Sequence, residues 1–418
     1  MTHRIPHPKR ILLFLTVAIA ALIGFAGTAS AAGQGSIVFI KNNDIWLANP
    51  DGSHQFRVTW DGSEDFPYLS PSQAADGTIA AGHVRDIVLM RQNGDVIREI
   101  DPPALINSVS HPMDGVPVDV AISPNGKRIA WSFVGYECDG TVNCGPRTAT
   151  GYTDSSGRTP VSKYGSTYFH NPSWVGNSRT LQGGGFGSQV MIHDLGQDPV
   201  HWFDDSDYAE YSTDLGDSEL SPDGSRLASI RGYGSETQLY TFEVSGNATS
   251  GPAPPVPSPD CMTGTEEGIA GPTWAPDSRH LAWQNDEGVW TGDLSDCGNA
   301  GLELVIPGAS EPDWGPAAVN PSPGGVRLPF ASLGRALKKG LTIDFTSIGK
   351  GRVDFTVKLG RTVVAADHGT APNAGPLRAV VRFKASARKR LSRMKTVRLS
   401  ISVSQSGKTA TAAGTLKK

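Results

Sequence analysis

The residues best equipped for chemistry are seven histidines spread between positions 54 and 280. They are His54, His83, His111, His170, His193, His201 and His280. Imidazoles bind metals and transfer protons, so a converging set would indicate a metal-assisted enzyme. Their irregular spacing does not predict convergence. We expect no catalytic residue among them, and we keep a metal-assisted polysaccharide lyase or hydrolase, acting through His170 or His201, as the alternative function.

An acidic stretch, "DDSDYAEYSTDLGDSE", is the second candidate for chemistry. Calcium prefers several carboxylate oxygens on one loop, but the glycine of an EF-hand loop is missing here. We therefore interpret the stretch as a solvated acidic loop, with structural calcium as the alternative, and we predict no metal ligand and no cofactor. Its acids are Asp204, Asp205, Asp207, Glu210, Asp214, Asp217 and Glu219.

Familiar catalytic motifs are absent from the sequence. It contains no G-x-S-x-G nucleophile elbow and no HExxH zinc motif. The "SGKT" at Ser406 lacks the glycine that a phosphate-binding loop needs, because position 402 is serine. Catalysis is therefore not the favoured prediction.

A proline-centred turn recurs six times and predicts the elements that position these residues. The best copy is Ser221-Pro222-Asp223-Gly224, and the others begin near Phe66, Val120, Asn171, Pro272 and Glu311. Proline presets φ, Asp or Asn forms an Asx turn and glycine accepts positive φ, so each copy predicts a β-hairpin. We assign the repeat's own aspartates, Asp223 and Asp277, to turn geometry.

Further strands follow each hairpin, which gives four strands per unit and predicts an all-β, six-bladed β-propeller. They start at Asp44, Asp86, Gln189, Gln238 and Gly288. The sixth turn, Glu311 to Pro316, has no strand after it, whereas Gly35 to Asn42 stands alone. We expect this N-terminal strand to close the ring. Over about residues 35–316 the pattern resembles the TolB-type propeller repeat, whose propeller works through protein partners.

The N-terminal segment and the cysteines predict export. Arg4, Lys9 and Arg10 precede an apolar run and a small-residue cleavage site, so residues 1–32 are expected to be a signal peptide, with no membrane span after its removal. Four cysteines favour the disulfides Cys138–Cys144 and Cys261–Cys297. Chain entropy predicts roughly 2 kcal/mol for the short loop and roughly 4 kcal/mol for the long one.

Within residues 33–319, the predicted propeller, one insertion from Tyr136 to Ser166 is rich in Gly, Ser and Thr. Loops on a rigid scaffold often carry binding function, so its tyrosines are a candidate interaction surface for a sugar or a peptide. The alternative is a long, disordered loop. The tyrosines are Tyr136, Tyr152, Tyr164 and Tyr168.

Charge divides the chain after the linker at 320–330. Residues 327–418 hold 20 Lys and Arg against three acids, whereas residues 33–326 hold 14 against 38. Six alternating segments predict strands from about Leu341 to the end, and Ala385 to Lys395 predicts a helix. We expect residues 331–418 to form a basic, immunoglobulin-like β-sandwich. It is similar to basic C-terminal domains on exported proteins of soil actinobacteria.

The basic cluster of this predicted domain leaves several partners open. It comprises Arg388, Lys389, Arg390, Arg393 and Lys395. An anionic cell-wall polymer, the acidic propeller itself and a solvated face without a ligand all remain open. Nucleic acid is not expected, because aromatic residues for base stacking are scarce. We predict a secreted, monomeric, non-catalytic scaffold that binds protein or glycan at the cell envelope, tethered by this domain.

Overall fold

The computed structural model describes residues 34–106, 111–138, 144–157, 160–166, 169–184, 189–208, 215–232 and 236–418. The predicted signal peptide at 1–32 therefore lies outside the described residues. Among the residues described, no helix is both long and apolar enough to cross a bilayer.

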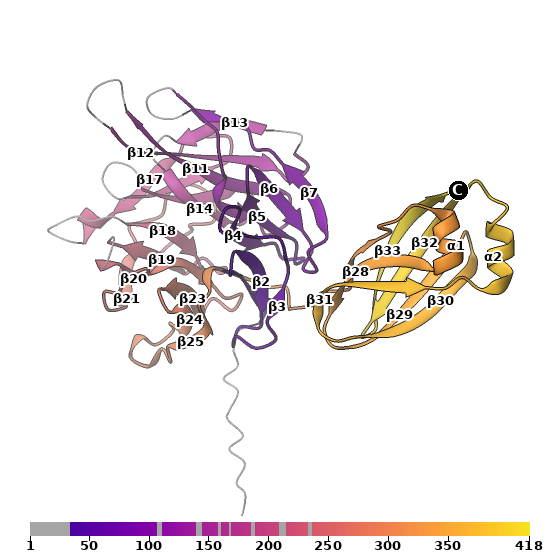
Figure 1. The fold of residues 1–418 in the computed structure, drawn as a ribbon. Coiled ribbons are helices and arrows are strands. Elements are labelled where there is room, and N and C mark those ends of the chain that lie inside the picture. The colour runs from indigo at the N-terminus through magenta and orange to yellow at the C-terminus, as the bar shows by residue number, and fades with distance from the viewer. Residues whose placement is uncertain are drawn as a thin grey trace, which may run out of the picture. The chain divides into compact units, whose positions relative to one another are not determined.

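Within these residues the propeller region consists of six four-stranded antiparallel sheets (Figure 1). Their strands, in order within each sheet, are β26 (Ser310–Gly315), β1 (Ser36–Lys41), β2 (Asp44–Ala48) and β3 (Phe56–Arg57); β4 (Tyr68–Gln73), β5 (Ile79–His83), β6 (Asp86–Met90) and β7 (Val96–Ile100); β10 (Val118–Ile122), β11 (Arg128–Cys138), β12 (Cys144–Asp154) and β13 (Pro160–Ser166); β14 (Phe169–Val175), β15 (Arg179–Gly184), β16 (Gln189–Asp194) and β17 (Val200–Asp204); β18 (Leu215–Leu220), β19 (Arg226–Arg231), β20 (Gln238–Glu243) and β21 (Ser258–Met262); β22 (Ala270–Trp274), β23 (His280–Asn285), β24 (Gly288–Asp293) and β25 (Glu303–Pro307). A two-stranded sheet joins β8 (Leu105–Ile106) to β9 (Pro112–Met113).

The first strands of these sheets contact one another in a closed order. Strand β4 contacts β10, β10 contacts β14, and the series continues through β18, β22 and β26 back to β4. Each sheet therefore packs against the next, and the sheets are arranged in a propeller-like circle.

The recurring turn has the geometry that its residues predict. In the best copy the Arg226 N–H donates to Ser221 Oγ at 3.0 Å, and the Ser225 N–H donates to Asp223 Oδ1 at 3.0 Å. Gly224 has φ of 76°. These contacts use the serine, the aspartate and the glycine to reverse the chain, which confirms the structural role assigned to Asp223.

The N-terminal strand closes the circle as predicted. Strand β1 pairs with β2 on one side and with β26 on the other, with Ser36 opposite Gly315 and Ile37 opposite Trp314. Its side chains are buried on both faces. One sheet is thus built from both ends of the propeller region, and the edge that each end would expose alone is removed.

The C-terminal part contains two antiparallel sheets. One has the order β27 (Gly324–Arg327), β28 (Leu341–Ile348) and β31 (Ala374–Val381), and the other has the order β30 (Thr362–Ala371), β29 (Gly351–Leu359), β32 (Thr396–Gln405) and β33 (Lys408–Lys417). Alternate residues are buried along β28 and β32, and both sheets contribute to one hydrophobic core. All six predicted strands are present.

Two short helices complete this part (Figure 1). Helix α2 (Ala385–Leu391) is the predicted helix, and it ends four residues before the expected Lys395. Helix α1 (Leu333–Lys339) was not predicted; Ser332 caps its N-terminus, where Ser332 Oγ accepts the Arg335 N–H at 3.3 Å. Leu333 and Leu391 bury one face of each helix in the core.

Candidate functional site

A cavity of about 800 Å³ lies among the first strands of the six sheets. Each of β4, β10, β14, β18, β22 and β26 contributes residues to its wall. Among the described residues that line it there is no Lys, Arg or His, but there are five carboxylates. These are Asp119, Asp217, Glu219, Glu311 and Asp313.

A bulge in every first strand places one residue at the cavity with a left-handed backbone. The register of each pair shifts at this point. The six bulge residues, each four positions before its turn, are Ser70 (φ 46°), Asp119 (50°), Asn171 (49°), Asp217 (45°), Gly271 (59°) and Glu311 (52°). Five of these six are not glycine, so each must be held in this conformation by its surroundings.

Hydrogen bonds from one sheet to the next hold the bulges. The Asp119 N–H donates to Ser70 Oγ at 2.9 Å, and the Asn171 N–H donates to Asp119 Oδ2 at 3.1 Å. The Gly271 N–H donates to Asp217 Oδ2 at 2.6 Å. Glu311 accepts the Ser70 N–H in the same way, which continues the pattern across the closing sheet.

A second set of contacts, two residues further along each strand, repeats this arrangement. The Gln73 N–H donates to Asp313 Oδ2 at 2.6 Å, and the Trp274 N–H donates to Glu219 Oε1 at 2.8 Å. The Trp314 N–H donates to Thr273 Oγ1 at 3.0 Å. In both sets a side chain of one sheet satisfies a backbone donor of its neighbour, so these polar groups join the sheets.

Burial in this cavity raises the pKa of four carboxyl groups. The pKa of Asp217 is raised to about 6 by burial and by the charge of Asp119, while the Gly271 N–H opposes the change. Burial, together with Asp313, raises the pKa of Glu219 well above its usual range. Burial also raises the pKa of Glu311 and of Asp313. Part of this acidic cavity is therefore protonated in mildly acidic solution.

The raised pKa of Asp217 gives a pH-dependent prediction. Between about pH 4 and pH 6 the folded state binds a proton that the unfolded state has released, so stability falls as the pH rises through this window. Asp217→Asn keeps an acceptor for the Gly271 N–H and removes the charge. We expect it to unfold with a free energy about 2 kcal/mol higher than wild type at pH 7.5 and equal to it at pH 4.

Urea unfolding at both pH values measures this difference. Glu243→Gln, which removes an exposed carboxylate from β20, is the control for a general loss of negative charge. An equal increase in the free energy of unfolding of both variants at pH 7.5 would contradict a specific role for the Asp217 carboxyl.

In the part of the chain that the structure describes, these histidines belong to no group of three potential metal ligands. His170 is on the innermost strand of its sheet and hydrogen-bonds to Asn171, whereas His201 is on the outermost strand, 3.4 Å from Asp204. Four of the others have separate partners: His54 bonds to Asn49, His83 stacks on Tyr68, His193 bonds to Gln182 and His280 pairs with Asp277.

The acidic stretch is not one solvated loop, and that prediction is wrong. Asp205 is 1% exposed and pairs with Arg231, with 2.6 Å between its Oδ1 and Arg231 Nε. Asp217 and Glu219 belong to β18 and line the cavity instead. These acids therefore do not all lie on one loop, and Glu210 and Asp214 lie outside the described residues.

The predicted insertion is mostly a long β-hairpin rather than a loop. Strands β11 and β12 pair from Arg128–Asp154 to Cys138–Cys144, which places the two cysteines directly opposite each other. Tyr136 is 74% exposed on this hairpin. Tyr152 is 8% exposed and packs in the core near Ile129, so its assignment to that surface is wrong. The side chains of Tyr164 and Tyr168 lie outside the described residues.

The predicted basic cluster is fully on the surface. Every side chain in it is exposed. Arg388, Lys389 and Arg390 belong to helix α2, and Arg393 and Lys395 follow it. The structure therefore keeps these five cations together and accessible.

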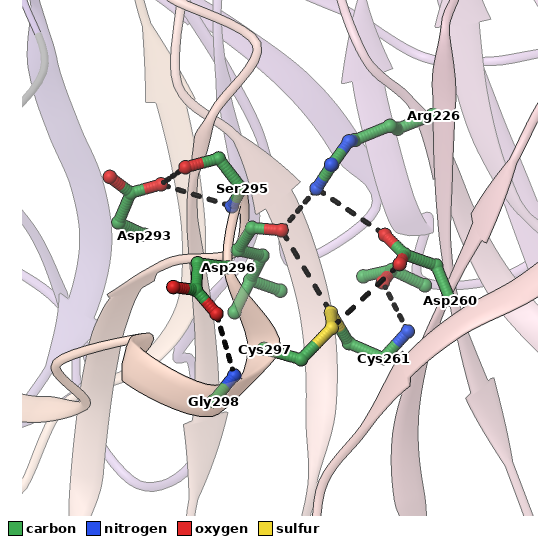
Figure 2. Close-up of a disulfide and its surroundings, with 10 residues drawn as sticks. Arg226, Asp260, Cys261, Asp293, Ser295, Asp296, Cys297 and Gly298 are labelled. Atoms are coloured by element: carbon green, nitrogen blue, oxygen red, sulfur yellow. Dashed lines mark hydrogen bonds and ion pairs between the residues drawn. A yellow bond between two sulfur atoms is a disulfide. The ribbon is translucent and has the colours of Figure 1, made fainter.

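The Cys261–Cys297 disulfide joins two neighbouring sheets (Figure 2). Cys261 is on β21, and Cys297 begins the 3-10 helix η3 (Cys297–Asn299) that follows β24. Beside it, Arg226 Nη1 lies 3.5 Å from Asp260 Oδ2. In the described part of the chain, Asp260 and these cysteines are the one group of three potential metal ligands within 4.8 Å of one another, and its sulfurs are bonded to each other.

The closed circle of four-stranded sheets around an acidic cavity defines a β-propeller-like protein. No protein-family model and no curated protein matches the chain. Propeller-like proteins are among the solved structures that resemble it. The Pseudomonas aeruginosa periplasmic gluconolactonase PpgL is 12% identical, with a TM-score of 0.40 over 68% of this chain and 99% of that one.

Two other solved structures have comparable similarity. An oligogalacturonate lyase in complex with manganese is 7% identical, with a TM-score of 0.39 over 63% of this chain and 70% of that one. A protein of unknown function from Bacteroides caccae is 10% identical, with a TM-score of 0.38 over 67% of this chain and 98% of that one. The activities of these proteins carry no argument for this chain.

Proposed function

We propose that the chain is a secreted, monomeric, non-catalytic scaffold that binds a protein or glycan partner at the cell envelope. Residues 1–32 are its signal peptide, and residues 33–319 form a six-bladed, TolB-like β-propeller. A linker at 320–330 leads to an immunoglobulin-like β-sandwich at 331–418, which tethers the protein to an anionic cell-wall polymer.

The observation that supports a scaffold is the use of the cavity carboxylates. Each of the five accepts a hydrogen bond from a backbone N–H of the neighbouring sheet. A general acid or base needs its carboxyl oxygens directed at a substrate. Here one oxygen of each carboxylate accepts an N–H at a junction between sheets, which supports a structural role.

The β11–β12 hairpin offers the surface for a partner. Val134 is 57% exposed and Tyr136 is 74% exposed, two positions apart on the same face of β11. Large apolar and aromatic side chains at the surface of a rigid element are typical of binding sites.

A paired assay on the full mature chain tests this proposal. We expect no cleavage of acidic polysaccharides with or without manganese or calcium, and we expect retention on purified cell walls at low salt. Cleavage that is lost in a His170→Ala variant would overturn the proposal in favour of a metal-assisted polysaccharide enzyme. Failure to bind cell walls at any salt concentration would overturn the tether.

A further inference from the structure

Three segments that are far apart in the sequence meet at one end of the C-terminal part. The Lys417 N–H donates to the Ala331 carbonyl at 2.7 Å, and the Lys418 N–H donates to the Lys395 carbonyl at 2.9 Å. Figure 1 accordingly shows α1, α2 and the C-terminus together at this end. We call this surface the basic pole and define it as α1, residues 384–395 and residues 417–418.

The basic pole is larger than the cluster that the sequence indicates. Helix α1 adds Lys338 and Lys339, the last strand adds Lys417, and Lys418 follows it, all with exposed side chains. No Asp or Glu occurs in any of the three segments. The charged side chains of the pole therefore all carry positive charge, and separate parts of the chain contribute them.

The acids of this region do not neutralise the basic pole. Asp344 pairs with Arg378, with 2.6 Å between Asp344 Oδ1 and Arg378 Nε. Asp354 pairs with Arg352, with 2.8 Å between Asp354 Oδ1 and Arg352 Nη2. The third acid, Asp367, lies on β30, outside the pole. Among the described residues no ion pair involves a cation of the pole, so its counter-charges come from solvent or from a partner.

The side chains of the pole favour recognition of phosphate over recognition of a sugar ring or a base. Phe383 is buried, and the guanidinium of Arg335 lies over the Phe330 ring at 4.0 Å, so a cation already occupies one face of the partly exposed ring. Arg388, Arg390 and Arg393 present guanidinium groups, which bind the two free oxygens of a phosphodiester in a bidentate manner.

From this geometry we propose that the basic pole binds a linear phosphodiester polymer of the cell envelope. The proposal deepens the tether described above and rests on it. Successive phosphates of such a polymer replace the solvent counter-ions of the exposed cations, and their release drives binding.

Binding of the full mature chain to purified poly(glycerol phosphate) tests the proposal. The pole variant carries Lys389→Gln, Arg390→Gln, Arg393→Gln and Lys395→Gln. The control variant removes four exposed cations elsewhere, by Arg91→Gln, Arg98→Gln, Lys127→Gln and Lys350→Gln. Both variants lower the net charge by the same amount, and thermal melting checks that both fold.

We expect the pole variant to bind poly(glycerol phosphate) at least ~10-fold more weakly than wild type at physiological salt. The slope of its log binding constant against log salt concentration should be less negative by about 3. The control variant should stay within about twofold of wild type, and wild type should bind polygalacturonate at least ~10-fold more weakly than poly(glycerol phosphate). Equal losses in the two variants, or binding to polygalacturonate or a DNA duplex as tight as to poly(glycerol phosphate), would overturn the proposal.

The same variants on purified cell walls separate the two proposals. If the pole variant is still retained on cell walls, the proposal that the basic pole binds the polymer is refuted, and the proposed tether remains. Absence of retention for the wild type as well would refute both.

Discussion

Phe39→Ala is expected to lower the free energy of unfolding by about 3–5 kcal/mol. Phe39 is 0% exposed in β1, the strand that closes the circle of sheets. Its ring packs in a cluster with Val289, Ile306 and Trp314. Truncation would leave a void between the closing sheet and its neighbour, where the surroundings are held by pairing on both sides of β1. Urea unfolding, followed by tryptophan fluorescence, measures the loss.

Phe66→Ala is the matched control for this prediction. The Phe66 side chain is 53% exposed, so the same truncation should change the stability by no more than about 0.5 kcal/mol. The free energy of unfolding of a typical domain is only about 5–15 kcal/mol. The loss expected for Phe39→Ala would therefore be a large fraction of the total. Similar losses for the two variants would mean that the closing strand does not limit stability.

Replacing both cysteines of the Cys261–Cys297 disulfide with serine should cost about 4 kcal/mol. The bond closes a loop with a sequence separation of 36, and the loss of this constraint increases the entropy of the unfolded chain. The bond also joins β21 to η3, so its removal frees two neighbouring sheets at their outer edge. Urea unfolding of the double variant, compared with wild type under oxidising conditions, measures the change.

Two comparisons make this result specific. A dithiol reductant should bring the wild type down toward the stability of the double variant. The Cys138→Ser, Cys144→Ser variant opens the shorter predicted loop and should lose roughly 2 kcal/mol. An equal loss in the two double variants would contradict the dependence on loop length.

The propeller-like arrangement was predictable because local residues specify it. Serine, aspartate and glycine at Ser221, Asp223 and Gly224 form the turn by contacts within six residues of chain. The lone strand at Gly35 to Asn42 and the missing strand after Glu311 imply each other, so their pairing followed from the repeat. The C-terminal strands were predictable from alternation alone, since one side of each faces the core.

The acidic cavity was missed, although its signal is present in the sequence. Aligning the six copies on their turns places Ser70, Asp119, Asn171, Asp217, Gly271 and Glu311 at the same position. These residue types share no chemistry by themselves. Their common role, a bulge facing the cavity, exists only when the sheets are arranged in a circle.

Other errors arose where distant contacts override local composition. The Gly- and Thr-rich insertion indicated a loop, but Gly151 pairs with Trp131, 20 positions earlier, in the ladder between β11 and β12. Asp205 looked solvated within its acidic stretch, yet its partner Arg231 comes 26 positions later. Neither contact is visible from neighbouring residues.

The shared closing sheet also determines when this protein can acquire its final form. Ser36 Oγ donates to the Ala317 carbonyl, 281 positions away, so bringing these ends together costs about 5 kcal/mol of chain entropy before the pairing forms. A growing chain lacks β26 until its synthesis is nearly complete, and until then β1 has no second neighbour. The circle is therefore completed only after nearly all of the propeller-like region has been synthesised.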